Sequence, residues 1–180
     1  GQFARAEGEF QAAVEIDPRL ADLGRDLNPD RPYQDTRVRM VVDDGRAFLE
    51  RTDERFDLIL FALPDSLTLV SGQSSLRLES YLFTLQAIET ARERLTQGGV
   101  FAMYNYYRER WLIDRFGRTL EDAFGHRPCI DEVGDQGRFA LLTIGIDRDS
   151  VECRRTWAPT ANPVPTSATD DHPFPYLREP

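Results

Sequence analysis

The sequence predicts an α/β fold with a mainly parallel β-sheet and helices on both of its faces. Short β-branched or apolar runs alternate with longer amphipathic stretches, which is typical of βαβ units. The expected strands are residues 11–16, 37–42, 56–62, 99–104 and 138–146. The chain has 180 residues, of which 41% are hydrophobic, so it can form one domain with a substantial core.

Helices are predicted between these strands by capping residues and by apolar periodicity. Asp17 can cap a helix in which Pro18 takes the first position. Further along the chain, apolar residues recur every three or four positions and mark the buried face of a long helix. The expected helices are residues 18–27, 45–52, 77–95 and 108–123.

The composition changes after about residue 147. Residues 157–180 hold more than half of the eleven prolines and show little periodicity. Such composition favours an irregular segment over further sheet. We therefore expect a partial α/β domain over residues 1–147 and a proline-rich tail or linker over residues 148–180.

The charge composition excludes several classes of function. A net charge of −9 and a pI near 4.8 would repel a phosphate backbone, so nucleic acid is not an expected partner, whereas a small cation is compatible. All 22 basic residues are arginine. The absence of lysine from the sequence removes a P-loop lysine, a Schiff-base lysine and a lysine general base.

Cysteine and histidine are scarce. Cys129 and Cys153 lie at no metal-ligand spacing and are expected as reduced thiols of a cytosolic protein. His126 and His172 are too far apart to suggest zinc, so no metal is expected. No apolar run approaches the roughly 20 residues of a membrane span, and no signal peptide opens the chain. The first residue is Gly1, which suggests a part of a longer protein.

Acidic residues follow three of the predicted strands. Ligands of open α/β sheets bind beyond the carboxyl ends of the strands, where Glu15, Asp44 and the pair Asp65-Ser66 are expected. Glu15 could accept both hydrogen bonds of a ribose diol, and Asp44 could accept one from an adenine amino group. Acids in these positions also cap helices, which is the alternative interpretation.

Four pieces of the sequence, taken in order, resemble the spermidine synthase (polyamine aminopropyltransferase) family, a branch of the S-adenosylmethionine-dependent methyltransferase fold. They are 14-VEIDP-18, 43-DDGRAFL-49, 56-FDLILFALPDS-66 and 79-ESYLFTLQAIETARERLTQGGV-100. Two more pieces resemble bacterial members in which this domain is joined to membrane-spanning segments. These are 65-DSLTLVSGQSSLRLESYLFT-84 and 169-TDDHPFPYLREP-180.

The resemblance implies a Rossmann-like fold and a nucleotide ligand, either S-adenosylmethionine or its decarboxylated form. It implies an amine or polyamine substrate and a cytoplasmic domain attached to the inner membrane in the full-length protein, and it is compatible with a homodimer. The implied site residues are Glu15 for the ribose, Asp44 and Gly45 for the adenine, and Asp65, Ser66 and Tyr104 for the amine, with Asp65 as the catalytic residue.

The sequence departs from the family pattern at two positions. Ala62 stands where the first acid of the active-site pair is expected, and Tyr104 stands at the family's glutamine. The acid helps to deprotonate the attacking amine, which alanine cannot do. Asp65, at the second acidic position, could still orient an ammonium group.

The glycine-rich loop of this fold is not found in the sequence. It normally lies roughly 20 residues before the ribose acid, and counting back from Glu15 passes the start of the chain. We therefore expect the first strand and its glycine loop to be missing, and nucleotide binding by the chain as given to be weak. Three functions remain open: an aminopropyltransferase, a small-molecule methyltransferase, and an inactive sensor or regulatory domain of a membrane protein.

Two groups of residues have both a functional and a structural interpretation. Tyr104, Tyr106 and Tyr107 could line a cation pocket with their ring faces, or could pack in the ordinary way with their hydroxyls exposed. The pair Asp170-Asp171 could be solvated charge in the tail, or could fold back across the site.

Overall fold

The computed structural model describes residues 11–62, 78–133 and 139–178. Contacts divide the chain into two compact units, Gly1–Thr52 and Asp53–Pro180. The sequence indicated one domain and a boundary near residue 147, where the composition changes. The structure instead places the division at residue 52, and the C-terminal residues belong to the second unit.

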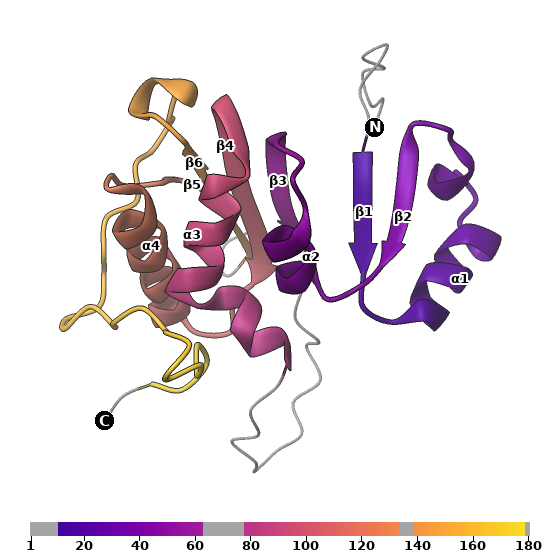
Figure 1. Ribbon diagram of the computed structural model, residues 1–180. Coiled ribbons are helices and arrows are strands. Elements are labelled where there is room, and N and C mark those ends of the chain that lie inside the picture. Colours follow the sequence, from indigo (N-terminus) through magenta and orange to yellow (C-terminus); the bar gives the residue numbers. More distant parts are fainter. Residues whose placement is uncertain (1–10, 63–77, 134–138, 179–180) are drawn as a thin grey trace. The chain divides into compact units, whose positions relative to one another are not determined.

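The first unit is a parallel βαβ arrangement (Figure 1). It consists of β1 (Gln11–Glu15), α1 (Pro18–Leu27), a 3₁₀ turn at Pro32–Gln34, β2 (Val38–Val42) and α2 (Gly45–Arg51). The Asp17 side chain accepts a hydrogen bond from the Arg19 N–H, and Pro18 takes the first helical position. This start of α1 confirms the predicted cap.

The second unit contains a four-stranded mixed sheet. Its elements are β3 (Phe56–Ala62), η2 (Leu78–Phe83), α3 (Leu85–Glu93), β4 (Leu95–Tyr106), α4 (Arg110–Phe124), β5 (Cys129–Val133), β6 (Phe139–Gly145) and η3 (Arg148–Ser150). The strand order is β3-β4-β6-β5. β3 and β4 are parallel, and β6 runs antiparallel to both β4 and β5. The predicted α/β class is confirmed.

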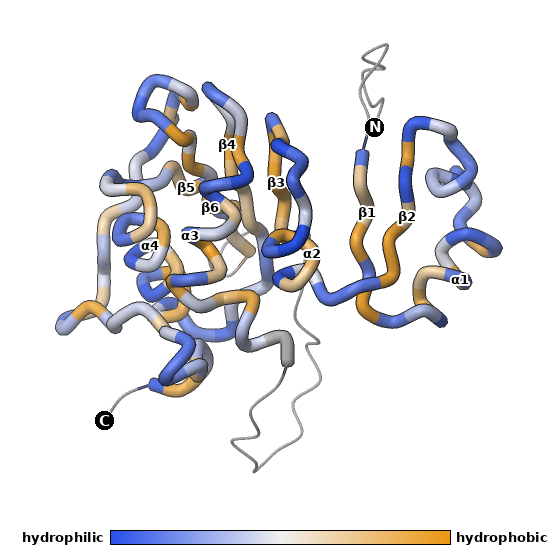
Figure 2. Tube along the Cα trace, viewed as in Figure 1, coloured by the Kyte–Doolittle hydropathy of each residue, from blue (hydrophilic) through white to orange (hydrophobic). Residues whose placement is uncertain are grey.

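The core of the second unit lies between the sheet and the two long helices. α3 and α4 cover one face of the sheet (Figure 1), and the strands themselves are largely apolar (Figure 2). Ile59 and Phe61 of β3 are buried, whereas Leu58 and Leu60 are exposed, as strand alternation requires. The largest buried side chains of β4, α4 and β6 include Phe101, Met103, Ile113, Leu120, Leu142 and Ile144.

The secondary structure differs most from the prediction at one helix and two strands. The expected helix 77–95 is a 3₁₀ helix followed by α3, because Thr84 ends the first and caps the second by accepting from the Ala87 N–H. β4 begins at Leu95 instead of residue 99, and the register shift opposite β3 accommodates the extra residues. β5 was not predicted, since its five residues carry no clear pattern.

The two cysteines form a disulfide, so the expectation of reduced thiols is wrong. Residues 155–157 run beside residues 128–130, with hydrogen bonds from the Ile130 N–H to the Arg155 carbonyl and from the Trp157 N–H to the Pro128 carbonyl. This pairing brings the Cα atoms of Cys129 and Cys153 to 5.1 Å, although 24 positions separate them in sequence.

The proline-rich segment, expected as a tail or linker, packs on the second unit. Trp157 is only 1% exposed and lies directly on Gly117 of α4, where a Cβ atom would come within 2.3 Å of the indole ring. The described part of the segment lacks long regular elements, in keeping with its composition. Within the described ranges, no helix is long and apolar enough to cross a membrane.

Candidate functional site

The carboxyl ends of β1 and β2 lie level with one another in the first unit. Glu15 is paired in register with Val42, and the Asp43 N–H donates to the Glu15 carbonyl at 3.1 Å. Because the two strands are parallel, the acids that follow them share one edge of the sheet. The structure therefore brings Glu15 and Asp44 to the same edge, as their positions in the sequence predict.

Glu15 uses one carboxylate oxygen to hold the turn that follows β1. Its Oε1 accepts a hydrogen bond from the Asp17 N–H at 2.9 Å, and the side chain is partly buried. Among the described residues, none donates a hydrogen bond to the second oxygen, Oε2. The local bond thus fixes the carboxylate and leaves Oε2 as an acceptor for a hydroxyl donor.

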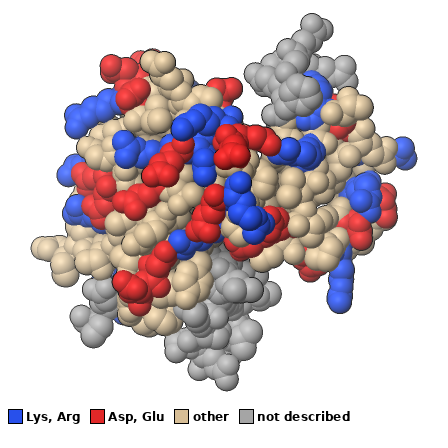
Figure 3. Space-filling model, in the orientation of Figure 1, with Lys and Arg blue, Asp and Glu red and all other residues tan. Residues whose placement is uncertain are grey.

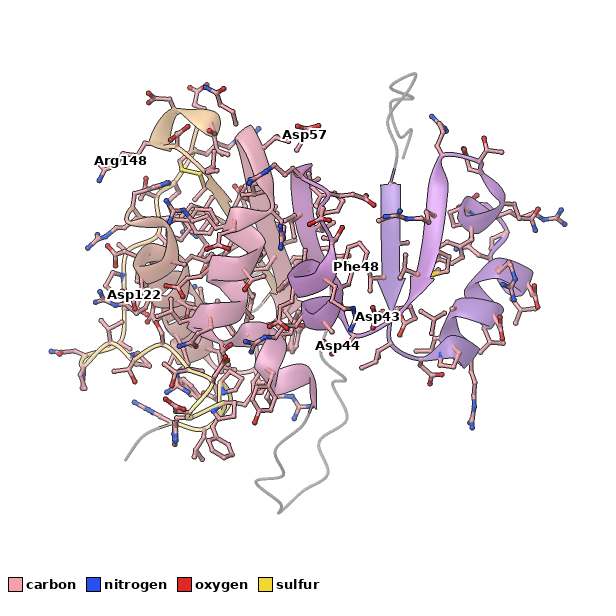
Figure 4. All side chains as sticks on the ribbon, in the orientation of Figure 1. Asp43, Asp44, Phe48, Asp57, Asp122 and Arg148 are labelled. Atoms are coloured by element: carbon pink, nitrogen blue, oxygen red, sulfur yellow. A yellow bond between two sulfur atoms is a disulfide. The ribbon has the colours of Figure 1, made fainter. Side chains whose placement is uncertain are left out.

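Asp44 and Gly45 form the start of α2. Oδ1 of Asp44 accepts from the Ala47 N–H at 2.9 Å, and Gly45 is the first helical residue (Figure 4). This is the capping role that the sequence left open as an alternative. A carboxylate has further acceptor capacity, so capping and a contact with a ligand amino group are compatible at Asp44.

The carboxylate of the neighbouring Asp43 is paired with an arginine of α2. Its carboxylate forms an ion pair with Arg51 at the end of α2 and also accepts from the Asp44 N–H at 2.9 Å. The hydrogen bond from Arg51 lowers the pKa of Asp43 below its ordinary value, with a further lowering by the Asp44 N–H, while partial burial opposes the shift. The same pair raises the pKa of Arg51. Asp43 therefore fastens α2 to the end of β2.

In the second unit, Ala62 and Tyr104 are neighbours at the carboxyl ends of β3 and β4. The two residues are paired in register, and Ala62, the last residue of β3, is exposed. Tyr104 is half-buried, with its ring centroid 5.8 Å from that of Phe139. The two departures from the family pattern therefore lie side by side, which the sequence did not show.

Tyr104 and Tyr106 at the end of β4 share one face of the sheet, and Tyr107, which follows β4, is buried. Tyr107 is buried and packs against Phe116, with 5.7 Å between ring centroids. Tyr106 is 42% exposed and alternates with buried Asn105, so it shares the face of Tyr104. Packing accounts for Tyr107, whereas Tyr104 is half-buried and Tyr106 is exposed. Asp65 and Ser66 lie outside the described residues.

The C-terminal segment reaches the start of α3. Oγ1 of Thr84 donates to Oδ1 of Asp170 at 2.7 Å, and the Asp170 N–H donates to Oε1 of Gln86 at 3.1 Å. The Leu85 N–H donates to the Ala168 carbonyl at 2.8 Å. Asp170 is therefore not solvated charge in a free tail.

Two charged residues of α4 were missed by the sequence analysis. Asp114 and Arg115 are both buried, although most of the other acids and arginines are exposed. Their signal in the sequence is a charged pair inside the apolar run 111-WLIDRF-116. On an amphipathic helix, such a pair indicates a buried polar contact.

The visible surface of the second unit carries charges of both signs (Figure 3). Acidic and arginine side chains are interspersed on the visible face of the second unit (Figure 3). Among the described residues, no group of three or more His, Cys, Asp or Glu side chains could hold a metal ion.

Comparisons with known proteins place this geometry in context. Residues 7–119 match the sequence profile described as the Spermine/spermidine synthase domain. The chain is 35% identical over 91 residues to the polyamine aminopropyltransferase of Buchnera aphidicola subsp. Acyrthosiphon pisum (strain Tuc7), an alignment that covers 49% of this chain and 31% of the relative. The enzyme of that name from Serratia proteamaculans (strain 568) is 34% identical over 108 residues, covering 58% and 34%. The matched region thus spans about a third of these relatives' length.

Solved structures share the fold. The spermidine synthase from Thermotoga maritima superposes with a TM-score of 0.59 at 16% identity, covering 79% of this chain and 47% of that one. Human methyltransferase-like protein 13, solved in complex with SAH, gives a TM-score of 0.58 at 16% identity, covering 79% and 64%. At such identities the likeness concerns the fold, and it confirms the Rossmann-like fold that the sequence predicted.

Proposed function

We propose, because the chain belongs to the spermine/spermidine synthase family, that it is a transferase domain for an S-adenosylmethionine-type nucleotide and an amine acceptor. The observation that carries the proposal is the level edge of β1 and β2, where Glu15 and Asp44 stand together. Both acids are fixed by backbone hydrogen bonds. Carboxylates that are already held in place lose less conformational freedom on binding, which supports contacts with a ribose and an adenine.

The hydrogen-bond acceptors at this edge suit a nucleoside. Glu15 accepts from the ribose hydroxyls, while Asp44 and the backbone of Gly45 contact the adenine. When bound, the sulfonium nucleotide supplies the activated group for transfer. We favour the decarboxylated form and hence aminopropyl transfer, because the ligand then has a larger net positive charge and the chain has a net charge of −9.

The acceptor lies at the carboxyl ends of β3 and β4. Asp65 is the catalytic residue of this proposal: it orients the ammonium group of the acceptor, and Ser66 lies beside it in the sequence. Tyr104 presents a ring face to the cation, a favourable contact in a partly desolvated position. Since Ala62 supplies no base, the acceptor's proton must pass to Asp65 or to water.

The test is calorimetric titration of the full-length protein with S-adenosylmethionine and, separately, with its decarboxylated form. Incubation with putrescine follows, and mass spectrometry detects any aminopropyl product. We expect tighter binding of the decarboxylated form and a product that gains one aminopropyl group. Absence of binding to either nucleotide would overturn the proposal.

A methyltransferase acting on a small molecule is the second candidate. The exposed Ala62 favours it, since the family's first acid is replaced at this position. Tighter binding of S-adenosylmethionine, with transfer of a labelled methyl group, would select this function. An inactive regulatory domain joined to membrane segments predicts nucleotide binding without any transfer, and membrane fractionation of the full-length protein tests the attachment.

A further inference from the structure

The C-terminal residues 157–177, here named the strap, are fastened to α3 and α4 by an unusual density of polar contacts. The match to the family ends at residue 119, so the strap lies beyond the part of the chain that the family accounts for. In the second unit the strap runs past the N-terminal ends of α3 and α4 (Figure 1).

Asp114 of α4 holds the first part of the strap. Its carboxylate is 0% exposed and accepts four hydrogen bonds, all from the strap. The donors are Nε1 of Trp157 at 3.2 Å, the Thr160 N–H at 3.0 Å, Oγ1 of Thr160 at 2.8 Å and the Ala161 N–H at 2.7 Å. Burial of a carboxylate is costly unless its oxygens are satisfied, so Asp114 and the strap depend on each other.

Arg115, the next residue of α4, holds the last part of the strap. One guanidinium nitrogen, Nη1, donates to three strap carbonyls: those of Phe174 at 3.0 Å, Pro175 at 2.9 Å and Leu177 at 2.7 Å. The guanidinium also lies over the ring of Trp111, 5.1 Å from its centroid. Asp114 and Arg115, adjacent residues of opposite charge, thus hold the two ends of the strap by hydrogen bonds.

The middle of the strap, between the parts bound by Asp114 and by Arg115, contacts the first turn of α3. Thr84, which caps α3 and is fully buried, donates to Asp170, and the Leu85 N–H donates to the Ala168 carbonyl. The first N–H groups of a helix have no partner within the helix, so a bond from outside stabilises that end. The strap therefore sets the position of the α3 N-terminus.

The direction of the chain places the N-terminus of α3 near the proposed acceptor site. α3 ends at Glu93, and β4 begins at Leu95, so the helix and the strand run in opposite directions. The start of α3 consequently lies toward the carboxyl end of β4, the end that holds Tyr104. Ligands of this class of fold bind at that end of the sheet.

We propose that Asp114 and Arg115 are positioning residues which, through the strap and Asp170, hold the first turn of α3 in the geometry that acceptor binding requires. The inference rests on the proposed transferase function. On this proposal, the strap belongs to the part of the protein that binds the acceptor. The nucleotide contacts assigned to Glu15 and Asp44 do not depend on it.

The test uses substitutions at the strap's contact with α3. D170A removes the acceptor of the Thr84 hydroxyl and leaves the cap of α3 in place, whereas T84V removes the hydroxyl that both donates to Asp170 and caps α3. D170N keeps an acceptor oxygen. E89Q is the matched control, since Glu89 is an exposed acid on the same helix. The measurements on the full-length protein are KM for putrescine, kcat, the nucleotide Kd, and amide hydrogen exchange of residues 85–88.

We expect D170A to raise KM for putrescine about five- to ten-fold, the effect of losing one partly buried hydrogen bond, and T84V to raise it at least as much. The nucleotide Kd should not change, exchange at residues 85–88 should accelerate, and D170N and E89Q should resemble the wild type. Faster exchange with unchanged KM would overturn the proposal, because the strap would then be structural only.

Failure of the transferase proposal is a separate result. If the wild type binds nucleotide but transfers nothing to putrescine, that proposal fails, and the strap is judged by calorimetric titration of putrescine alone. A weaker Kd in T84V and D170A supports the positioning role, and an unchanged Kd overturns it. D114N and R115K then test whether the hydrogen bonds from Asp114 and Arg115 to the strap affect putrescine binding in the same way.

Discussion

The carboxylates of the two units differ in how completely the protein uses them. Glu15 and Asp44, at the strand ends of the first unit, are partly exposed, and each accepts one backbone hydrogen bond through a side-chain oxygen. Asp114, inside the second unit, is fully buried and accepts four. A carboxylate with remaining acceptor capacity can serve a ligand, whereas a saturated, buried one serves the fold.

The largest effect is expected from D114A. The substitution leaves four strap donors without their acceptor inside the protein, and each buried unsatisfied group costs about 1–3 kcal/mol. Some donors will reach water, so we expect a loss of about 3–5 kcal/mol in the free energy of unfolding of the second unit. Urea denaturation followed by tryptophan fluorescence measures it. A loss similar to that of E89Q would show that Asp114 is not the anchor of the strap.

Reduction of the disulfide should have the next largest effect. The Cys129–Cys153 bond closes a segment with a sequence separation of 24, and a loop of that size contributes roughly 3 kcal/mol by restricting the unfolded chain. Denaturation with and without a reducing agent measures the difference, with the C129S/C153S double variant as control. An unchanged midpoint in the reducing agent would mean that the strap and the sheet hold this edge without the bond.

Gly117 of α4 lies in close contact with Trp157 of the strap. A Cβ atom at Gly117 would lie 2.3 Å from the indole ring, so G117A must displace the ring. Overpacking of this kind costs typically 1–3 kcal/mol, partly offset by alanine's helix propensity. Tryptophan fluorescence and urea denaturation report it. S150A serves as control, since Ser150 lies elsewhere in the unit, and equal stability of the two variants would contradict the contact.

The local part of the structure was predictable from the sequence. Asp17 and Pro18 marked the start of α1, and the acids after two apolar runs located the edge that holds Glu15 and Asp44. These signals involve residues a few positions apart, where capping geometry and strand alternation leave few alternatives. The places of these acids after the strands suggested contacts with a ribose and an adenine, and the likeness of the pieces to a known family points to the same proposed roles.

The strap could not be predicted in this way. Asp114 bonds to residues 43 to 47 positions away, and Arg115 to carbonyls 59 to 62 positions away. Proline-rich composition indicates irregular backbone but not whether that backbone packs. Likewise, the distance between Cys129 and Cys153 depends on the alignment of residues 128–130 with residues 155–157, which only the folded chain shows.

At the strand ends of the first unit, E15Q and D44N should weaken nucleotide binding without unfolding the protein. Glutamine and asparagine keep an oxygen that can accept from the Asp17 and Ala47 N–H groups, so the local bonds survive. Loss of the carboxylate charge should weaken binding about ten-fold, since bonds to charged acceptors are roughly twice as strong as neutral ones. Titration of the full-length protein with nucleotide measures this, and E54Q is a control on an exposed acid.

The smallest effect on stability is expected from the ion pair between Asp43 and Arg51. This pair occupies the Asp43 carboxylate, in contrast to that of its neighbour Asp44. The hydrogen bond from Arg51 lowers the pKa of Asp43, so Asp43 contributes stability above its unfolded-state pKa and loses it as the pH falls through the lower folded-state value. R51A should raise the pKa of Asp43 toward its ordinary value, which a carbon-detected NMR titration of the carboxyl group can follow. Because the pair lies at the surface, the free energy of unfolding should change little. An unchanged pKa in R51A would mean that the Asp44 N–H, and not Arg51, holds the Asp43 carboxylate in its charged form.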